Sequence, residues 1–391
     1  IGLPLPRGLV NDPEQVSMFH GRKRISSQKI VRQFWDRGRS IRWLGLDFIA
    51  EYENGIASDY VAVVSSKPSN SKIRKPLQVT ADDGAVEITT GPARFRWTAA
   101  GKGLPDAAWF DTDGNGKFSN DEQVIKSGPN DGAYWIATSV DGGRCDLTGD
   151  LKFTIEESGP MKAVLRVDGW YEGRRKKERN CRATVRFTAF AGQAFLHMAH
   201  TFVITFDDRK EKIRDIGLRL GVPGTKAGSF SHLEGTPISL KATEKASYLN
   251  QSWWNEFKVI QEGEDPNRPS AVHNGTKALG MVSVVSPRAR VTMALRDSWQ
   301  LYPKEFGFDE GSISVHPWPG HPVGYSGSWD YQARRELDPD NIWKLWYAHR
   351  QSYYGMSLTF PQSYFDRIKQ EIEKNPGQGS ADTYAATGLQ S

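Results

Sequence analysis

Short runs in which apolar and polar residues alternate recur along most of this chain, separated by Gly, Pro, Asp and Asn. Successive side chains of a β-strand point to opposite faces, so such alternation predicts strands with one buried face. The candidates run from LQVTA, which begins at Leu77, through MKAVLRVDGWY and CRATVRFTAF to SISVHPWP. Many strands with almost no helical spacing predict a mainly β protein built around a large antiparallel β-sandwich.

Two alternating runs near the middle of the chain, residues 194–206 and 213–220, are separated by the charged turn Asp207-Asp208-Arg209-Lys210. Strands joined by a polar turn are typical of a hairpin, so the pattern predicts a hairpin-like unit in the middle of the sheet. His197 and His200 lie in the first run.

The chain divides into three parts by its pattern. Residues 1–75 carry short alternating runs and predict a small N-terminal β-barrel-like domain, which ends in the polar linker 66–75 (SKPSNSKIRK). Residues 76–360 predict the large sandwich. Residues 361–391 predict one short C-terminal helix, with apolar residues at helical spacing between 363 and 374, and a flexible Gly- and Ser-rich tail.

The charge balance favours an acidic partner. Lys and Arg exceed Asp and Glu by 5, and the pI is about 9.0, which suits a polyuronate, a sulfated glycan or a nucleic acid. The basic runs Arg22–Arg24 and 174–179 are most simply solvated hairpin tips, and no recognisable nucleic-acid module accompanies them, so we expect no nucleic-acid partner.

The sequence shows no pattern typical of a membrane-spanning segment or a signal peptide. No apolar run approaches the ~20 residues of a membrane helix, so we expect no membrane span. The first residue already lies within the pattern, so any signal peptide is expected to be removed or absent.

Cys145 and Cys181 could form a disulfide if their strands are neighbours, or both could be buried thiols.

The sharpest local motif is DTDGNGKFSNDE at residues 111–122. It matches the EF-hand loop, in which oxygen ligands at fixed spacings wrap Ca²⁺ and a glycine at the sixth position, here Gly116, makes the sharp turn. The predicted ligands are Asp111, Asp113, Asn115, the carbonyl of Lys117, Ser119 through water, and a bidentate Glu122. No helical pattern flanks the loop, so we expect calcium as a structural cofactor. The alternative is a metal-free turn.

Several segments resemble one family of proteins. QFWDRGRSIRWLGLDF (Gln33 to Phe48) and GLPLPRGLV (Gly2 to Val10) resemble a RIFT-barrel-like N-terminal domain. FTIEESGPMKAVLRVDGWY, HTFVITFDD, IRDIGLRL, DSWQLYPKEF and ISVHPWP resemble the β-sandwich domain that follows it. The family is the exo-rhamnogalacturonan lyase-like group of polysaccharide lyases, and the resemblance covers about residues 1–360.

The resemblance implies a secreted or periplasmic polysaccharide lyase that acts on an acidic polysaccharide such as rhamnogalacturonan. Family members usually continue into a helical third domain, which this chain is expected to lack from about Gly355–Phe360 onward. A missing helical domain or partner subunits are therefore expected to complete the protein.

A lyase removes the C5 proton of a uronate whose carboxylate must be neutralised, while an acid protonates the leaving oxygen at C4. We expect Tyr302 or His316 to serve as base or acid, and Arg214 and Lys304 to neutralise the carboxylate. His200 is a further catalytic candidate. The candidates for substrate binding, with Trp318 stacking on a sugar, are His197, Trp318, His321 and Tyr325.

Other interpretations stay open at this point. His200 could be a hydrogen-bonded core histidine, and Arg214 with Asp215 could be a surface ion pair. Asp297, Glu305 and Asp309 could supply the paired carboxylates of a glycosidase, although nothing in the sequence sets their separation. The non-catalytic alternative is a calcium-stabilised carbohydrate-binding or structural module of a larger surface assembly.

Overall fold

The computed structural model describes residues 1–319, apart from residues 36, 51–58, 69–72, 74–75, 83, 138–142, 174–178, 207–212, 254 and 263–269. The side chains of seven further strand residues, among them Arg214, are also outside the description. The predicted helix at 363–374, His321 and Tyr325 lie outside the described residues.

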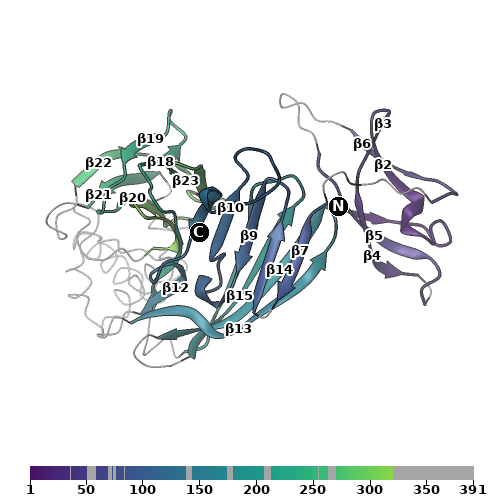
Figure 1. Cartoon of the computed structure of the whole chain (residues 1–391), viewed down its shortest axis with the longest axis horizontal. Helices are drawn as coiled ribbons and strands as arrows, with labels where there is room; N and C mark the ends of the chain where they lie inside the picture. Colours follow the sequence, from purple (N-terminus) through teal and green to yellow (C-terminus); the bar gives the residue numbers. More distant parts are fainter. Residues whose placement is uncertain are drawn as a thin grey trace, which may run out of the picture. The chain divides into compact units, whose positions relative to one another are not determined.

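The described chain is mainly β, with large antiparallel sheets, as the alternation predicts (Figure 1). Its helices are three single 3₁₀ turns, η1 (Pro13–Gln15), η2 (Ala99–Gly101) and η3 (Asn120–Glu122). No helix within the described ranges is long and apolar enough to cross a membrane.

Two three-stranded sheets form the N-terminal part of the chain. One has the order β1 (Gly2–Pro4), β5 (Ile41–Asp47), β4 (Gln28–Phe34), and the other β3 (Lys23–Ile25), β2 (Val16–His20), β6 (Tyr60–Val64). Their inward-facing apolar side chains share one core, made of Leu5, Val10, Val16, Met18, Ile41, Leu44 and Leu46.

A five-stranded sheet follows, in the order β11 (Gln123–Lys126), β10 (Ala107–Phe110), β9 (Ala93–Trp97), β8 (Ala85–Thr89), β7 (Gln78–Asp82). A four-stranded sheet has the order β19 (Ile238–Lys241), β18 (Ala227–His232), β23 (Ala278–Val285), β24 (Arg290–Ala294).

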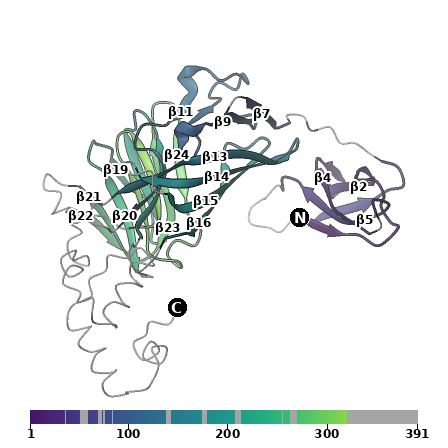
Figure 2. The same cartoon turned by 90° about the horizontal axis from the view of Figure 1, so that it is seen from below.

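The long sheet has eleven strands, of which β13, β14 and β15 run side by side in Figure 2. Their order is β16 (Leu196–Ile204), β15 (Arg179–Phe190), β14 (Lys162–Gly173), β13 (Arg144–Ser158), β12 (Gly132–Ala137), β17 (Ile213–Gly221), β26 (Ser312–Trp318), β25 (Lys304–Phe308), β20 (Ser247–Trp253), β21 (Glu256–Gln261), β22 (Ser270–Gly275).

The predicted hairpin of residues 194–220 is wrong. Its two strands, β16 and β17, both form but do not pair. Both edges of β17 are already occupied, because it is hydrogen-bonded to β12 on one side and to β26 on the other. Alternation indicates which face of a strand is buried, and it carries no information on the neighbouring strand.

The chain forms two compact units, and each has its own sandwich core. The first comprises Ile1–Gln123, Asp150–Trp170 and Arg182–Val203, and the second comprises Val124–Gly149, Tyr171–Cys181 and Ile204–Ser391. In the first unit, the fully buried ring of Trp97 in the five-stranded sheet packs on Phe187 of β15 with centroids 5.2 Å apart. In the second, Phe230 of β18 packs on Phe308 of β25 at 5.2 Å.

Within the first unit, Gln28 fastens β4 to the turn between β13 and β14. Its Oε1 accepts the backbone N–H of Met161 at 2.9 Å and that of Lys162 at 3.0 Å, and its Nε2 donates to Glu157 at 2.8 Å. A Cβ on Gly159 would lie 2.2 Å from the Gln28 carboxamide, so the glycine is what makes room for this contact.

Candidate active site

One face of the long sheet in the second unit is polar although it is buried. Directly opposed residues of antiparallel strands share a face, and alternate residues along each strand return to it. The pairs Glu305↔His316, Asn250↔Glu305 and Arg219↔Ser314 therefore stand on this face together. We call it the polar face. Its described side chains are Tyr134, Arg144, Asp146, Asp215, Arg219, Tyr248, Asn250, Glu305, Ser314 and His316.

The opposite face of the same strands is apolar. Leu218, Leu249, Phe306 and Val315 alternate with the polar residues, and each is 2% exposed or less. The four-stranded sheet packs on this side, and a Cβ on Gly228 of β18 would lie 2.5 Å from the Phe308 ring. Hydrophobic packing on one side thus holds the strands that display the polar groups on the other.

His316 and Asp215 form the centre of the polar face. The His316 Nδ1 lies 2.9 Å from Asp215 Oδ1 and 3.1 Å from Oδ2, and its Nε2 lies 3.3 Å from Ser314 Oγ. The two side chains are 6% and 4% exposed. Burial pulls the pKa of His316 down, but the carboxylate of Asp215, and after it that of Glu305, outweigh this, so the pKa is raised above 6.5.

Glu305 and Asn250 extend this cluster across β25 and β20. Both are fully buried, and Asn250 Nδ2 donates to Glu305 Oε2 at 3.0 Å. The Oδ1 of Asn250 is buried without a hydrogen-bond partner in the described part of the chain. A fully buried carboxylate is costly unless it is hydrogen-bonded or paired, so this position is typical of a functional cluster.

Tyr134 stands beside His316, with its ring edge-on to the imidazole at 6.2 Å between centroids. Burial raises the pKa of Tyr134 far above its usual 10, so its hydroxyl keeps its proton at neutral pH. The Arg144 guanidinium lies over the ring at 3.9 Å and donates to Asp146 at 2.7 Å. A Cβ on Gly217 would lie 2.3 Å from the Tyr134 ring, so only glycine leaves room for it there.

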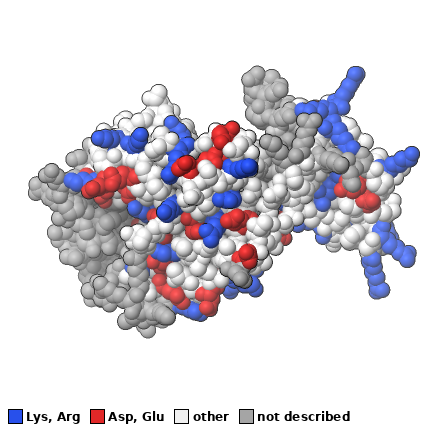
Figure 3. All heavy atoms as spheres, in the orientation of Figure 1, with Lys and Arg blue, Asp and Glu red and all other residues white. Residues whose placement is uncertain are grey.

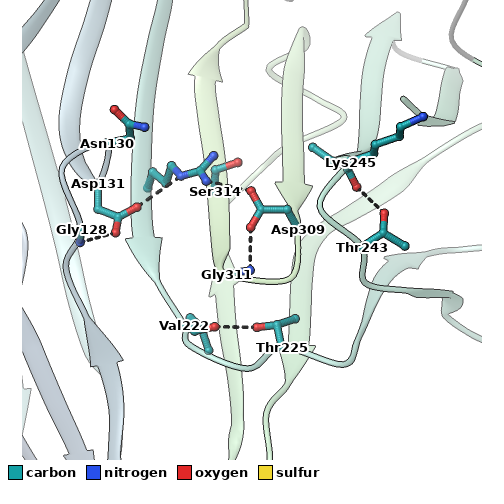
Figure 4. A network of polar contacts seen from close by, with 12 residues as sticks. Gly128, Asn130, Asp131, Val222, Thr225, Thr243, Lys245, Asp309, Gly311 and Ser314 are labelled. Atoms are coloured by element: carbon teal, nitrogen blue, oxygen red, sulfur yellow. Dashed lines mark hydrogen bonds and ion pairs between the residues drawn. The ribbon is translucent and has the colours of Figure 1, made fainter. Parts of the chain in front are cut away.

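Arg219 joins three segments at the other end of the polar face. Figure 4 shows its two partners, Asp131 and Asp309, with their contacts to Gly128 and Gly311. The Arg219 Nε donates to Asp131 at 3.2 Å, and its Nη2 donates to Asp309 at 2.7 Å. The same carboxylates accept the backbone N–H groups of Gly128 at 2.6 Å and Gly311 at 2.8 Å. This network fixes the loop before β12 and the β25–β26 turn relative to β17.

The sequence-predicted catalytic residues divide between the two units. His316 lies on the polar face, whereas Lys304 is the next residue to Glu305 on β25 and therefore points to the opposite side. Its ammonium group donates to the carbonyls of Leu301 and Pro303, and burial lowers its pKa to about 8. Tyr302 is half-buried just before β25. Arg214 is on β17, but its side chain lies outside the described residues.

The histidines of β16 belong to the first unit. His197 is exposed, and His200 is half-buried with its ring centroid 6.1 Å from that of Phe202. Burial lowers the pKa of His200 to about 4, so this imidazole is neutral near pH 7. Trp318 is half-buried at the end of β26, opposite Ile216. His321 and Tyr325 lie outside the described residues.

Sequence reasoning missed most partners of His316. The sequence offers Asp215 only as the possible partner of Arg214 in a surface ion pair, whereas the structure buries it against His316. Glu305 was considered only as a glycosidase carboxylate, and Tyr134 and Asn250 not at all. The sequence carries one signal for these residues. Within β17 and β25, charged residues stand directly beside residues that the alternation predicts to be buried.

The loop at residues 111–122 brings its predicted acidic ligands together. Ligand oxygens of Asp111, Asp113 and Glu122 lie within 4.8 Å of one another. Glu122 accepts the backbone N–H of Thr112 at 2.8 Å and that of Ser119 at 3.0 Å, and these bonds lower its pKa to about 2.

The remaining donor atoms of this loop also fit a hard cation. Asp111 Oδ2 accepts the N–H of Gly116 at 2.9 Å, while its Oδ1 is buried without a hydrogen-bond partner among the described residues. Asn115 Oδ1 accepts the N–H of Lys117 at 2.7 Å. All of these are oxygen donors, which is the ligand class that Ca²⁺ prefers.

Cys145 and Cys181 are both buried free thiols, which decides between the two possibilities that the sequence left open.

The comparison with known families identifies part of the chain. Residues 77–232 match the family described as PcRGLX-like protein central beta sandwich domain, which confirms the resemblance to rhamnogalacturonan lyase-like proteins. The matched segment contains Tyr134, Asp215 and Arg219 of the polar face and the loop at 111–122. No curated protein matches the chain. The match supports a role related to polysaccharide lyases at the level of the family.

Proposed function

We propose that this chain, whose residues 77–232 match the PcRGLX-like central β-sandwich domain, cleaves an acidic, uronate-containing polysaccharide by β-elimination. The observation that carries the proposal is the buried His316–Asp215 pair on the polar face. A rhamnogalacturonan is the glycan class that the family suggests, and a secreted or periplasmic location accords with such a substrate.

His316 is the proposed base. When Nδ1–H donates to the carboxylate of Asp215, the lone pair of Nε2 is the atom that can take a proton from substrate. His316 Nε2 removes the C5 proton, the electrons of the C5–H bond form the C4=C5 double bond, and the C4–O bond breaks. Asp215 stabilises the imidazolium that results, as its effect on the pKa of His316 implies.

Tyr134 is the proposed acid. It keeps its proton at neutral pH, stands beside His316, and can donate the proton that the leaving oxygen at C4 requires. Neutralising the uronate carboxylate requires a cation or a protonated group, because the C5 proton is otherwise too weakly acidic. Arg144 lies over Tyr134 on the same face as His316 and is the proposed cation, whereas Lys304 points to the opposite side of β25.

The test is the ultraviolet absorbance of the unsaturated uronate product during incubation with a panel of acidic polysaccharides. The wild-type chain is expected to produce it on one of them, and His316→Gln to lose at least 100-fold in rate, which is the lower range for removing a general base. His232→Gln is the matched control, since His232 is also a buried histidine of the second unit, on β18, bonded to the Thr236 carbonyl at 2.9 Å.

The calcium loop favours a second, non-catalytic function. We infer that Asp111, Asp113, Asn115, Lys117, Ser119 and Glu122 hold one Ca²⁺, which stabilises the excursion between β10 and β11. A chain that retains an acidic glycan and binds calcium but forms no unsaturated product would be a calcium-stabilised carbohydrate-binding module.

Calcium binding is testable by titration calorimetry with the metal alone. Glu122→Gln removes the proposed bidentate ligand and is expected to weaken binding at least tenfold. Asp121→Asn is the matched control, because it removes the same charge from the same loop at a position outside the ligand set. Equal calcium affinity of the two variants would contradict the assignment.

A further inference from the structure

The positive charge of this chain is concentrated in its first 50 residues. These contain nine Lys and Arg against four Asp and Glu, an excess of five, which equals the excess of the whole chain. The remaining 341 residues are therefore balanced. Figure 3 shows Lys and Arg side chains projecting around the surface of the N-terminal sheets. A field of one sign over one small domain attracts polyanions to it.

Three large aromatic side chains lie within this charge. Phe34, Trp35 and Trp43 are each 43% exposed, on or beside the paired strands β4 and β5. Scattered exposed apolar residues need no explanation, but several aromatics together are typical of a binding surface. With Arg32 and Arg42, which are also exposed, they make up what we call the aromatic–arginine patch.

Two contacts hold the Trp35 ring of the patch in place. The Trp35 indole N–H donates to the Leu5 carbonyl at 2.9 Å, and the Arg42 guanidinium lies 4.7 Å from the centre of the Trp35 ring. A ring held by a hydrogen bond on its edge keeps its orientation, so less entropy is lost when it packs against a ligand.

Two glycines make room for the other members. A Cβ on Gly2 would lie 2.6 Å from the Trp43 indole nitrogen, and a Cβ on Gly45 would lie 3.1 Å from the Arg32 Nε. Gly2 and Gly45 are directly opposed on β1 and β5 and share a face of the sheet. The Trp43 indole and the Arg32 guanidinium therefore pack directly against the backbone of the two glycines, where any larger residue would push them away.

We propose that the aromatic–arginine patch is an auxiliary binding surface for an acidic polysaccharide, separate from the chemistry on the polar face. Ring faces of Trp pack against the apolar faces of sugar rings, and arginine pairs with the carboxylates of a uronate. Charge complementarity selects an acidic rather than a neutral glycan. The choice of a uronate-containing glycan rests on the proposed function, whereas the surface itself does not depend on cleavage.

The test measures binding of the full chain to soluble polygalacturonate by titration calorimetry in the His316→Gln background, so that no substrate is cleaved. Trp43→Ala and Arg42→Gln are each expected to weaken binding about five- to tenfold, the loss found when an interface anchor is truncated. Trp43→Phe, which keeps a ring, is expected to recover most of the affinity. Arg296→Gln is the matched control, since Arg296 belongs to the second unit and its side chain is 92% exposed.

Two comparison ligands test whether the partner is an acidic polysaccharide. A neutral galactan is expected not to bind, and single-stranded DNA of equal charge is expected to compete poorly, because it offers phosphates without the same sugar faces. Unchanged binding in both Arg42→Gln and Trp43→Ala would overturn the proposal, as would DNA competition as strong as that of the glycan.

The outcomes also separate this proposal from the lyase proposal. A wild-type chain that forms no unsaturated product but binds polygalacturonate through the patch would contradict only the lyase proposal. A chain that forms the product while its patch variants bind normally would contradict only the patch. Circular dichroism of each variant checks folding, and Arg42→Gln, an exposed change, keeps the test valid if Trp43→Ala destabilises the sheet.

Discussion

Replacing Asp215 by Asn should change how the stability of the protein depends on pH. The substitution keeps a side chain of the same shape against His316 but removes its negative charge. Burial of His316 remains, and it lowers the pKa, whereas the largest opposing influence is lost. The pKa of His316 is therefore expected to move from above 6.5 in the wild type to below 6.5 in the variant.

The direction in which stability changes with pH follows from proton binding at His316. In the wild type, the folded chain binds a proton at His316 more tightly than the unfolded chain does. This stabilisation is fully present below pH 6.5 and is lost as pH rises through the folded pKa. In the variant, the unfolded chain binds the proton more tightly, so stability falls as pH drops below 6.5. The two chains therefore diverge on acidification.

The magnitude is about 1.4 kcal/mol for each pH unit over which one proton separates the folded and unfolded states. At pH 8.5 the variant loses little more than one hydrogen bond to a charged group, about 1.5–3 kcal/mol. At pH 5.5 the loss should approach the ~3–5 kcal/mol that follows removal of one partner from a buried pair.

Urea unfolding of both chains at pH 5.5, 7.0 and 8.5 measures this difference directly. Groups that titrate alike in the two chains cancel in the comparison. A destabilisation that is the same at pH 5.5 and 8.5 would refute the reasoning, because it would mean that His316 carries no extra proton in the folded wild type.

Three further predictions concern other parts of the chain. Calcium should raise the melting temperature of the wild type and leave that of Glu122→Gln almost unchanged, and an equal rise in both would contradict the proposed ligand. Gln28→Ala should cost about 2–4 kcal/mol in urea unfolding, because the backbone N–H groups of residues 161–162 lose their acceptor; a cost below ~1 kcal/mol would show that water replaces it. Cys145 and Cys181 are buried and burial raises the pKa of Cys181 to about 12, so a thiol reagent should react with neither in the native chain and with both after denaturation; rapid native labelling would count against their burial.

The fold could be predicted from sequence as far as alternation reaches. Apolar residues at every second position of MKAVLRVDGWY predict a strand with one buried face, and β14 has that pattern of burial. The partner of each strand could not be predicted, as β16 and β17 show, because pairing is decided by which edges remain open once the whole sheet forms. The same limit applies to the site.

The candidate site joins residues that are distant along the chain. His316 is 101 residues from Asp215, and Asn250 is 55 residues from Glu305. Their proximity depends on the order and register of four strands, β17, β26, β25 and β20, neither of which a local pattern encodes. The calcium loop is the opposite case, because all its predicted ligands lie within twelve residues and the spacing alone brings Asp111 and Glu122 together.

The most direct test of the central claim is the rate of unsaturated uronate formation as a function of pH, for the wild type and for Asp215→Asn. If His316 is the base, it must be neutral to act, so the wild-type rate should rise with pH through a pKa above 6.5. In Asp215→Asn the maximal rate should fall and the apparent pKa should shift below 6.5. An identical pH profile in the two chains, or full activity in His316→Gln, would contradict the account.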